Sequence, residues 1–215
     1  MAGPLCLPAA HAGDLQGPRN TLTADQALGR LRQGNVDFVD DRQHVVAMNH
    51  QRRLEIAKGQ TPFAVLADCS DSRVAPELPF GRVLGELFIV YVAGNSVDRT
   101  ALGSIEYGVA ALGCPLVLVM GHESCGAVQA AVQVVTEDKT FPGAIGEMVA
   151  PIIPSVLRAQ KTPGDLVTNT GKEHVRRVVK RLTEADDVLS DPVQSGHVKV
   201  VGAFYHFDGT VEFLT

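Results

Sequence analysis

The chain has 215 residues, which is enough for one domain with a sizeable core. Hydrophobic residues make up 45% of it and charged residues 20%, values that exclude a chain disordered throughout. The formal net charge of −5 provides no basic field for nucleic acid or an anionic membrane surface, so we expect neither as a partner.

The amino-terminal segment predicts an arm followed by a capped helix. The first 20 residues are rich in Ala, Gly and Pro and show no apolar periodicity. We therefore predict a flexible arm over 1–22 and a single domain over 23–215. Thr23 and Gln26 have the spacing of a capping box, and apolar residues at helical spacing predict a helix from Ala24 to Phe38.

From residue 47 onward, helix-like segments alternate with short apolar runs bounded by Gly, Pro and polar residues. Such runs are typical of strands buried on both faces, and they are Phe63–Ala67, Leu87–Val92, Leu116–Met120 and Val198–Phe204. The helix-like segments are 47–58, 100–112, 123–135, 144–160 and 172–185. The alternation predicts an α/β fold with a central, mainly parallel sheet flanked by helices. Phe204 to Leu214, with Asp208 and Gly209 in the middle, predicts a terminal hairpin.

Cysteine usage and hydropathy bear on the compartment. In a chain of this length, four cysteines fit metal-binding or buried thiols in a reducing compartment better than a disulfide scaffold. The longest apolar stretch, Val109 to Met120, is broken by Gly113 and Pro115 and is too short to span a bilayer. No signal-peptide pattern is evident at the amino terminus. We expect a cytoplasmic protein that does not insert into membranes. The cysteines are Cys6, Cys69, Cys114 and Cys125.

Two polar clusters follow directly after two of the predicted strands. One contains Cys69, Asp71 and Arg73, and the other contains His122 and Cys125. Ligands of open α/β sheets bind at the carboxyl ends of the strands, so neighbouring strands would bring both clusters to one edge. Zinc favours thiolate and imidazole ligands, and a site with three protein ligands leaves a fourth position open for catalysis. The clusters therefore predict a catalytic zinc site.

Each element of that site also has a simpler interpretation. His122 and Cys125 stand at i and i+3, which would place them on one face of a helical turn, but an isolated H-x-x-C is more often a buried His and Cys than a metal site. Asp71 and Arg73 would form an ordinary loop salt bridge. In the functional interpretation, Arg73 holds Asp71 ionised, and Asp71 either accepts a hydrogen bond from the zinc-bound solvent or occupies the fourth position and switches activity off.

A cysteine phosphatase is the other enzyme class to test against these residues. Its nucleophilic cysteine precedes a phosphate-gripping arginine, as Cys69 precedes Arg73. The spacing here is shorter than the usual five-residue loop, and Asp71 would repel a phosphate. Because motifs do not transfer when their spacing fails, we set this class aside.

Beyond the clusters, the sequence resembles the β-class carbonic anhydrases over roughly residues 23–215. The matching strings are Gln33-Gly-Asn-Val-Asp-Phe38, Cys69-Ser-Asp-Ser-Arg-Val74, Gly94-Asn95, Ser104-Ile-Glu-Tyr-Gly-Val109, Gly121-His-Glu-Ser-Cys-Gly-Ala-Val128, Val201-Gly-Ala-Phe-Tyr205 and Val211-Glu-Phe-Leu214.

The resemblance implies a parallel sheet extended by an antiparallel strand, and reversible hydration of carbon dioxide to bicarbonate and a proton. It implies one Zn²⁺ per subunit, held by Cys69, His122 and Cys125, with Asp71 and Arg73 as the catalytic dyad. It also implies a homodimer or homotetramer with the active site at the subunit interface.

Four further residues match substrate-binding positions of the family. Gln60 matches a glutamine that in some members reaches the substrate from the partner subunit, and Phe88 and Tyr107 match residues that line the carbon dioxide pocket. Gly126 follows the third zinc ligand, where a backbone N–H can bind the substrate oxygen. Phe88 and Tyr107 would equally suit the core of any α/β domain, and Gln60 a surface position after a helix.

Departures from the family pattern limit what the resemblance implies. Tyr91 stands where many members carry Arg, and the chain has no Trp, so the tryptophan-containing inhibitory bicarbonate site of some members cannot form. This favours an open zinc at neutral pH. His174 and His206 are candidate proton carriers by residue type only, and each is expected at the surface or as a cap.

Two alternative functions stay open at this point. One is a related hydrolase of carbon disulfide or carbonyl sulfide. The other is a non-catalytic, zinc-stabilised regulatory domain of a larger protein, for which fusion to a transporter is a precedent in the family.

Overall fold

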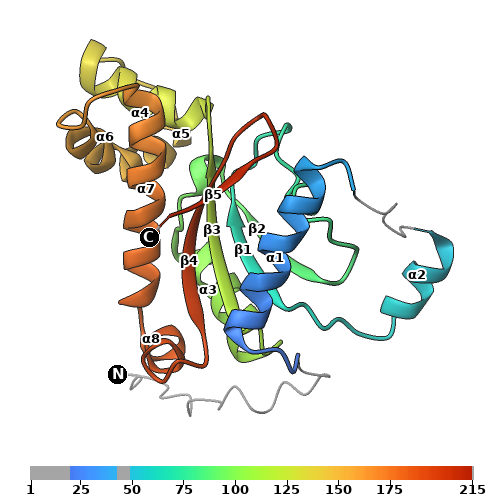
Figure 1. Ribbon diagram of the computed structural model, residues 1–215. Coiled ribbons are helices and arrows are strands. Elements are labelled where there is room, and N and C mark those ends of the chain that lie inside the picture. Colours follow the sequence, from blue (N-terminus) through green and yellow to red (C-terminus); the bar gives the residue numbers. More distant parts are fainter. Residues whose placement is uncertain (1–19, 43–48, 215) are drawn as a thin grey trace, which may run out of the picture.

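The computed structural model describes residues 20–42 and 49–214 and contains a five-stranded sheet (Figure 1). The strand order is β2-β1-β3-β4-β5, in which the first four strands are parallel and β5 is antiparallel to β4. This confirms the predicted fold class. The predicted terminal hairpin is β4 with β5. The strands are β1 Ala64–Asp68, β2 Leu87–Tyr91, β3 Leu116–His122, β4 Lys199–Tyr205 and β5 Val211–Leu214.

Helices cover both faces of this sheet. On one face, α1 (Ala24–Val39) buries Ala27 and Leu31 against β1 and β3. On the opposite face lie α3 (Arg99–Ala110), α7 (Leu166–Thr183) and α8 (Asp187–Gln194). Every residue of β1 and β3 is buried, as their continuous apolar runs predict for strands between two helical layers.

Besides the apolar cores on the two faces of the sheet, a third apolar cluster lies beyond the carboxyl ends of the strands. It is formed by α4 (Gly126–Glu137), α5 (Ala144–Val149) and α6 (Ile153–Ala159), which gather at one end of the sheet in Figure 1. Cys69 and Cys125 belong to this cluster. Helices α4, α5 and α6 therefore surround the sulfur atoms of the candidate site with apolar side chains.

The helix predictions hold in part. The capping box of Thr23 and Gln26 begins α1 as predicted. Helix α2 (His50–Ile56) lies within the predicted segment 47–58. Residues 47 and 48 of that segment, and residues 1–19 of the predicted arm, lie outside the described residues. The single helix over 144–160 is wrong, because Pro151 and Pro154 divide it into α5, the 3₁₀ turn Ala150–Ile152 and α6.

Two carboxyl-terminal helices also differ from the prediction. The helix predicted over 172–185 begins earlier, at Leu166, because the Asp165 side chain caps it through the backbone N–H of Thr168 at 2.7 Å. Helix α8 was not predicted. It is short and contains Pro192, a residue that argues against a helix in the sequence, but Asp186 caps its start. Within the described ranges, no helix combines the length and the apolar character needed to cross a membrane.

Candidate metal centre

The three candidate ligands meet where β1 and β3 end. These strands are parallel neighbours with Asp68 opposite Met120, so Cys69, just after β1, lies beside the end of β3, where His122 is the last residue. Cys125 is the N-cap residue of α4. One ligand atom from each of Cys69, His122 and Cys125 lies within 4.8 Å of the others, and all three residues are buried. The two sulfur atoms are 3.8 Å apart.

His122 and Cys125 reach this position by a route that differs from the predicted helical turn. His122 is extended at the end of β3, Ser124 adopts a left-handed conformation with φ 53°, and Cys125 precedes the helix. The prediction that both residues lie on one face of a helical turn is therefore wrong. The left-handed residue turns the chain sharply, so that the ring and the thiol converge from a strand and a helix cap.

The ring of His122 is oriented for a metal ion. Its Nδ1 lies 2.8 Å from the carbonyl oxygen of Glu123, and because a carbonyl only accepts, Nδ1 carries the proton. In the neutral ring, Nε2 then has the lone pair; this atom is fully buried and has no hydrogen-bond partner among the described residues. A buried lone pair without a partner, facing two thiols, fits the donor set of zinc.

The two thiols favour a cation as well. Their mutual hydrogen bond lowers the pKa of Cys125 to about 7, and it raises that of Cys69, which is also buried, to about 12. One of two sulfur atoms 3.8 Å apart can thus ionise readily, but not both. A divalent ion between them would remove that conflict and bind both as thiolates.

Gly94 contributes a backbone donor that the sequence analysis did not assign. Its N–H lies 3.2 Å from the sulfur of Cys69. Its φ of 68° is left-handed, and an added Cβ would lie 2.8 Å from Cδ1 of Ile152 and 3.0 Å from Cβ of Ala127. Only glycine therefore fits this turn without strain. The Gly94-Asn95 pair in the sequence was the available signal.

Asp71 and Arg73 form a bidentate ion pair at the edge of the centre. Nε and Nη2 of Arg73 each donate to a carboxylate oxygen of Asp71 at 2.8 Å, and the Arg73 backbone N–H adds a bond of 3.0 Å. These bonds hold the pKa of Asp71 well below its usual range. Oδ2 of Asp71 is 3.8 Å from Nε2 of His122. The carboxylate thus stands beside the ligands, paired with Arg73.

Arg73 is itself fixed from two further directions. Its Nη2 donates to the carbonyl oxygen of Ser124 at 3.1 Å, in the turn between two candidate ligands. Its guanidinium carbon lies 4.5 Å from the ring centre of Phe207, whose ring centre is 5.9 Å from that of His122. The sequence analysis missed Phe207. Its only signal was an aromatic residue within the predicted terminal hairpin.

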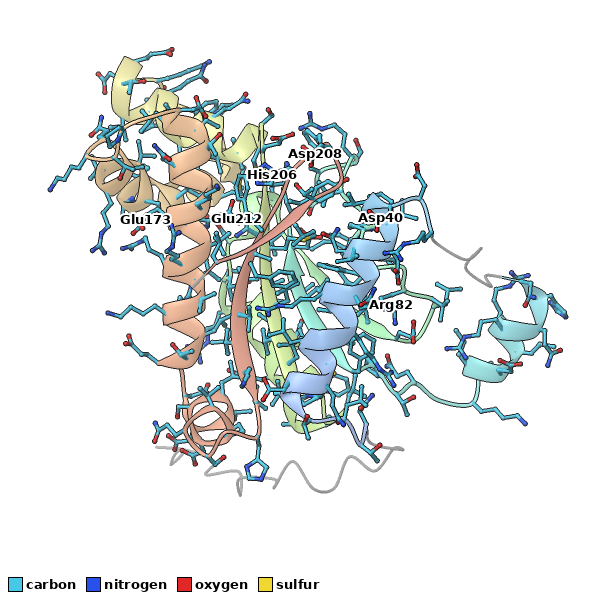
Figure 2. The ribbon with its side chains drawn as sticks, viewed as in Figure 1. Asp40, Arg82, Glu173, His206, Asp208 and Glu212 are labelled. Carbon is cyan, nitrogen blue, oxygen red and sulfur yellow. The ribbon has the colours of Figure 1, made fainter. Side chains whose placement is uncertain are left out.

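The hairpin that carries Phe207 is tied to the same turn. The carboxylate of Glu123 accepts from the backbone N–H of Phe207 at 2.6 Å, and Nδ1 of His206 lies 3.4 Å from it. Figure 2 shows His206 and Asp208 at the hairpin and Glu212 on β5. The other nitrogen of the His206 ring is 3.4 Å from Glu212, so this residue lies between two carboxylates.

The predicted substrate residues do not all lie together beside the three candidate ligands. Gly126 opens α4 directly after Cys125, next to the centre. Phe88 lies on β2 opposite Val65 of β1, and Val65 precedes Cys69 by four residues. The ring of Phe88 contacts that of Tyr107, with 6.0 Å between the ring centres.

Gln60 is exposed and lines a cavity of about 290 Å³ with residues of α2 and its flanks. Within the described part of the chain, Gln60 does not share that cavity with any of the three ligands.

The family model described as carbonic anhydrase matches residues 64–211. Carbonic anhydrase 2 of Mycobacterium tuberculosis is 38% identical over 179 residues, which cover 83% of this chain and 86% of that protein. A carbonic anhydrase of Mycolicibacterium smegmatis is 36% identical over 183 residues, covering 85% of this chain and 89% of that protein.

Solved structures agree on the fold. One of two structures described as tetrameric β-carbonic anhydrases, from the filamentous ascomycete Sordaria macrospora, superposes with a TM-score of 0.70 at 21% identity, covering 88% of this chain and 97% of that one. A Coccomyxa β-carbonic anhydrase, solved in complex with acetazolamide, gives a TM-score of 0.65 at 25% identity, covering 87% of this chain and 86% of that one.

Proposed function

The chain belongs to the β-carbonic anhydrase family, and from that membership we propose that it catalyses the reversible hydration of carbon dioxide to bicarbonate and a proton. The observation that carries the proposal is the buried set of Cys69, His122 and Cys125, with the unpartnered Nε2 of His122, beside the ion pair of Asp71 and Arg73. A buried site with the ligand types of zinc thus lies next to an ionised carboxylate that is held in place to accept a hydrogen bond.

We propose that one zinc ion per subunit is held by Cys69, His122 and Cys125. When bound, it would supply a Lewis acid that brings the pKa of a water molecule to about 7. The residues support this role, because Nδ1 of His122 is fixed by the Glu123 carbonyl and Cys69 receives the Gly94 N–H. Such surroundings hold ligands in place before the metal arrives.

Asp71 then acts as a hydrogen-bond acceptor that orients the attacking water. Because Arg73 keeps the pKa of Asp71 well below its usual range, the Asp71 carboxylate stays ionised across the neutral range and can accept a hydrogen bond from the water molecule. Arg73 in turn is fixed by Ser124 and Phe207. The intact pair supports the open arrangement over one in which Asp71 is the fourth ligand, since that arrangement would have to break two bonds of 2.8 Å.

Further members of the active site are proposed from the resemblance. Gly126 lies beside Cys125, where its backbone N–H can bind a substrate oxygen. Phe88 and Tyr107 contact each other, and Gln60 lines a cavity beside α2 whose described lining contains none of the three ligands. This placement supports a homodimer or homotetramer in which a second copy contributes Gln60. Exposed Tyr107 and Gln60 are available for such an assembly.

We also propose a cytoplasmic location. The cysteines described by the structure, Cys69, Cys114 and Cys125, are all buried and free of disulfide bonds, which fits a reducing compartment.

Stopped-flow carbon dioxide hydration combined with metal analysis tests the function. The native chain should hold one zinc per subunit and hydrate carbon dioxide across roughly pH 6.5–9, with a rate that rises as the ionising groups lose protons. Cys125→Ala should lose both metal and activity. One zinc per subunit without hydration at any of these pH values would overturn the proposal. Turnover of carbon disulfide or carbonyl sulfide in such a sample would instead identify the related hydrolase.

A further inference from the structure

A buried polar network lies behind the turn that supports Cys69. We propose that His174 of α7 is a positioning residue of the metal centre, which holds the turn Gly94–Ser96 where the N–H of Gly94 reaches the sulfur of Cys69. The inference deepens the proposed function, on which it rests, by assigning a role to a residue that does not contact the metal ligands itself.

The contacts of His174 join three separate parts of the chain. Its Nε2 is 3.1 Å from the hydroxyl of Ser96, and its Nδ1 is 3.4 Å from the hydroxyl of Ser155 on α6. His174 is 3% exposed, Ser96 6% and Ser155 0%. The expectation of a surface or capping role for His174 is therefore wrong. The imidazole bridges the turn to two helices in the interior.

His174 makes this bridge as a neutral ring. Burial, assisted by the charge of Arg177, lowers its pKa to about 4, while the Gly94 carbonyl acts in the opposite direction as a hydrogen-bond acceptor. A neutral imidazole has one N–H donor and one lone pair, and a serine hydroxyl can complement either. The network is thus satisfied without a buried charge, and the ring lies close to the backbone of Gly94.

The turn itself requires such an anchor. Gly94 and Asn95 are both left-handed, with φ of 68° and 45°, a conformation that glycine adopts freely and asparagine adopts more readily than most other residues. The side-chain nitrogen of Asn95 is buried and lacks a hydrogen-bond partner in the described structure, so this nitrogen adds no hydrogen bond that would hold the turn. The backbone adds one bond, from the N–H of Asn95 to the carbonyl of Val92 at 2.8 Å. Ser96 is the next residue, and its hydroxyl is where His174 attaches.

A displacement of the turn would change the electron density and the orientation of the Cys69 sulfur. The N–H of Gly94 withdraws electron density from the thiolate at 3.2 Å. If the turn moves and this bond lengthens, the sulfur becomes more electron-rich and the ligand less well oriented. Substitutions in such outer contacts typically cost about 10–100-fold in metal affinity.

Three variants separate positioning from packing. His174→Leu removes both polar contacts but keeps an apolar side chain. His174→Gln places a neutral amide near the position of Nε2 and should restore the contact with Ser96. Thr170→Val is the matched control, since Thr170 lies one turn earlier on α7, is 0% exposed, and its hydroxyl has no described partner.

The readouts are zinc affinity, by competition with a chelator, and the sulfur-to-metal charge-transfer absorption of the cobalt-substituted protein. We expect His174→Leu to weaken zinc binding by about 10-fold or more and to move the charge-transfer band to lower energy. His174→Gln should recover most of both properties, and Thr170→Val should match the native protein.

The proposal is overturned if His174→Leu lowers the melting temperature but leaves zinc affinity and the cobalt spectrum unchanged, because His174 would then only fill space. It is also overturned if Thr170→Val shifts them as much as His174→Leu does. Should His174→Leu fail to fold, Ser96→Ala cuts the same bond with a smaller change in volume, and the same outcomes decide. Both readouts are independent of hydration, so a native protein that binds zinc but lacks activity would refute the proposed function alone.

Discussion

Replacing Gly94 by alanine tests the close packing around the turn that supports Cys69. The added Cβ would be 2.8 Å from Cδ1 of Ile152 and 3.0 Å from Cβ of Ala127, closer than side-chain carbons normally approach. Ile152 can move, since Cδ1 is the end of its side chain, but Ala127 is fixed on α4. The substitution also places a Cβ on a backbone with φ of 68°.

These two effects set the expected loss of stability. A left-handed alanine costs about 1–2 kcal/mol. Forcing a neighbouring side chain off its preferred rotamer costs about 0.5–1.5 kcal/mol more. The free energy of unfolding should therefore fall by about 1.5–3.5 kcal/mol, which for a chain of this size lowers Tm by about 3–14 °C.

Thermal unfolding of the zinc-loaded and metal-stripped protein measures this loss. Gly103→Ala is the control, because it lies inside α3, where no described atom stands within 4 Å of its added Cβ. An unstrained Gly→Ala change inside a helix should stabilise by about 0.5–1 kcal/mol. For Gly94→Ala we also expect a smaller rise in Tm on adding zinc, since the N–H bond to Cys69 is disturbed. A Tm within about 1 °C of the native value would refute the reasoning.

Three further predictions concern separate contacts. Asp165→Ala should cost about 1 kcal/mol at pH 7 as a lost helix cap. Because the cap's hydrogen bonds lower the folded pKa of Asp165, its contribution is present above the ordinary value of 3.8 and is lost as the pH falls through the folded pKa, so melting curves of native and variant should converge in acid. Phe207→Ala removes the ring 4.5 Å from Arg73 and should lower kcat/KM for hydration about two- to fivefold, whereas Phe207→Tyr should not. Gly34→Ala places a Cβ 1.9 Å from the backbone oxygen of Phe80, so α1 should detach and become sensitive to limited proteolysis; full activity with a native Tm would contradict this.

The sheet was predictable because its signal is local. Strands β1 and β3 are short, continuous apolar runs between polar or breaking residues, and the sequence places both within two residues of their observed bounds. The order of the strands required more than periodicity. The turn signal of Asp208 and Gly209 predicted the antiparallel pair at the carboxyl terminus, and the resemblance to a known family implied that it extends the parallel sheet. The bounds of the helices were harder to predict than those of the strands, since single residues such as Pro151 and Asp165 decide where a helix ends or begins.

The candidate site shows the same division. Cys69, His122 and Cys125 follow strands, and the rule that strand ends converge predicts their meeting. The route by which His122 and Cys125 converge was predicted wrongly, because a left-handed Ser124 cannot be read from residue type.

The sequence by itself determined the fold class, the identity of the three buried ligand candidates and the neighbouring pair of Asp71 and Arg73. These depend on residue type and on spacings of a few positions, which short-range geometry translates into structure. The tertiary structure alone decided that Phe207 covers Arg73 and that His174 is buried against Ser96. Those pairs are separated by 134 and 78 positions respectively (207 − 73 and 174 − 96), so their contacts exist only once the sheet and α7 have packed together.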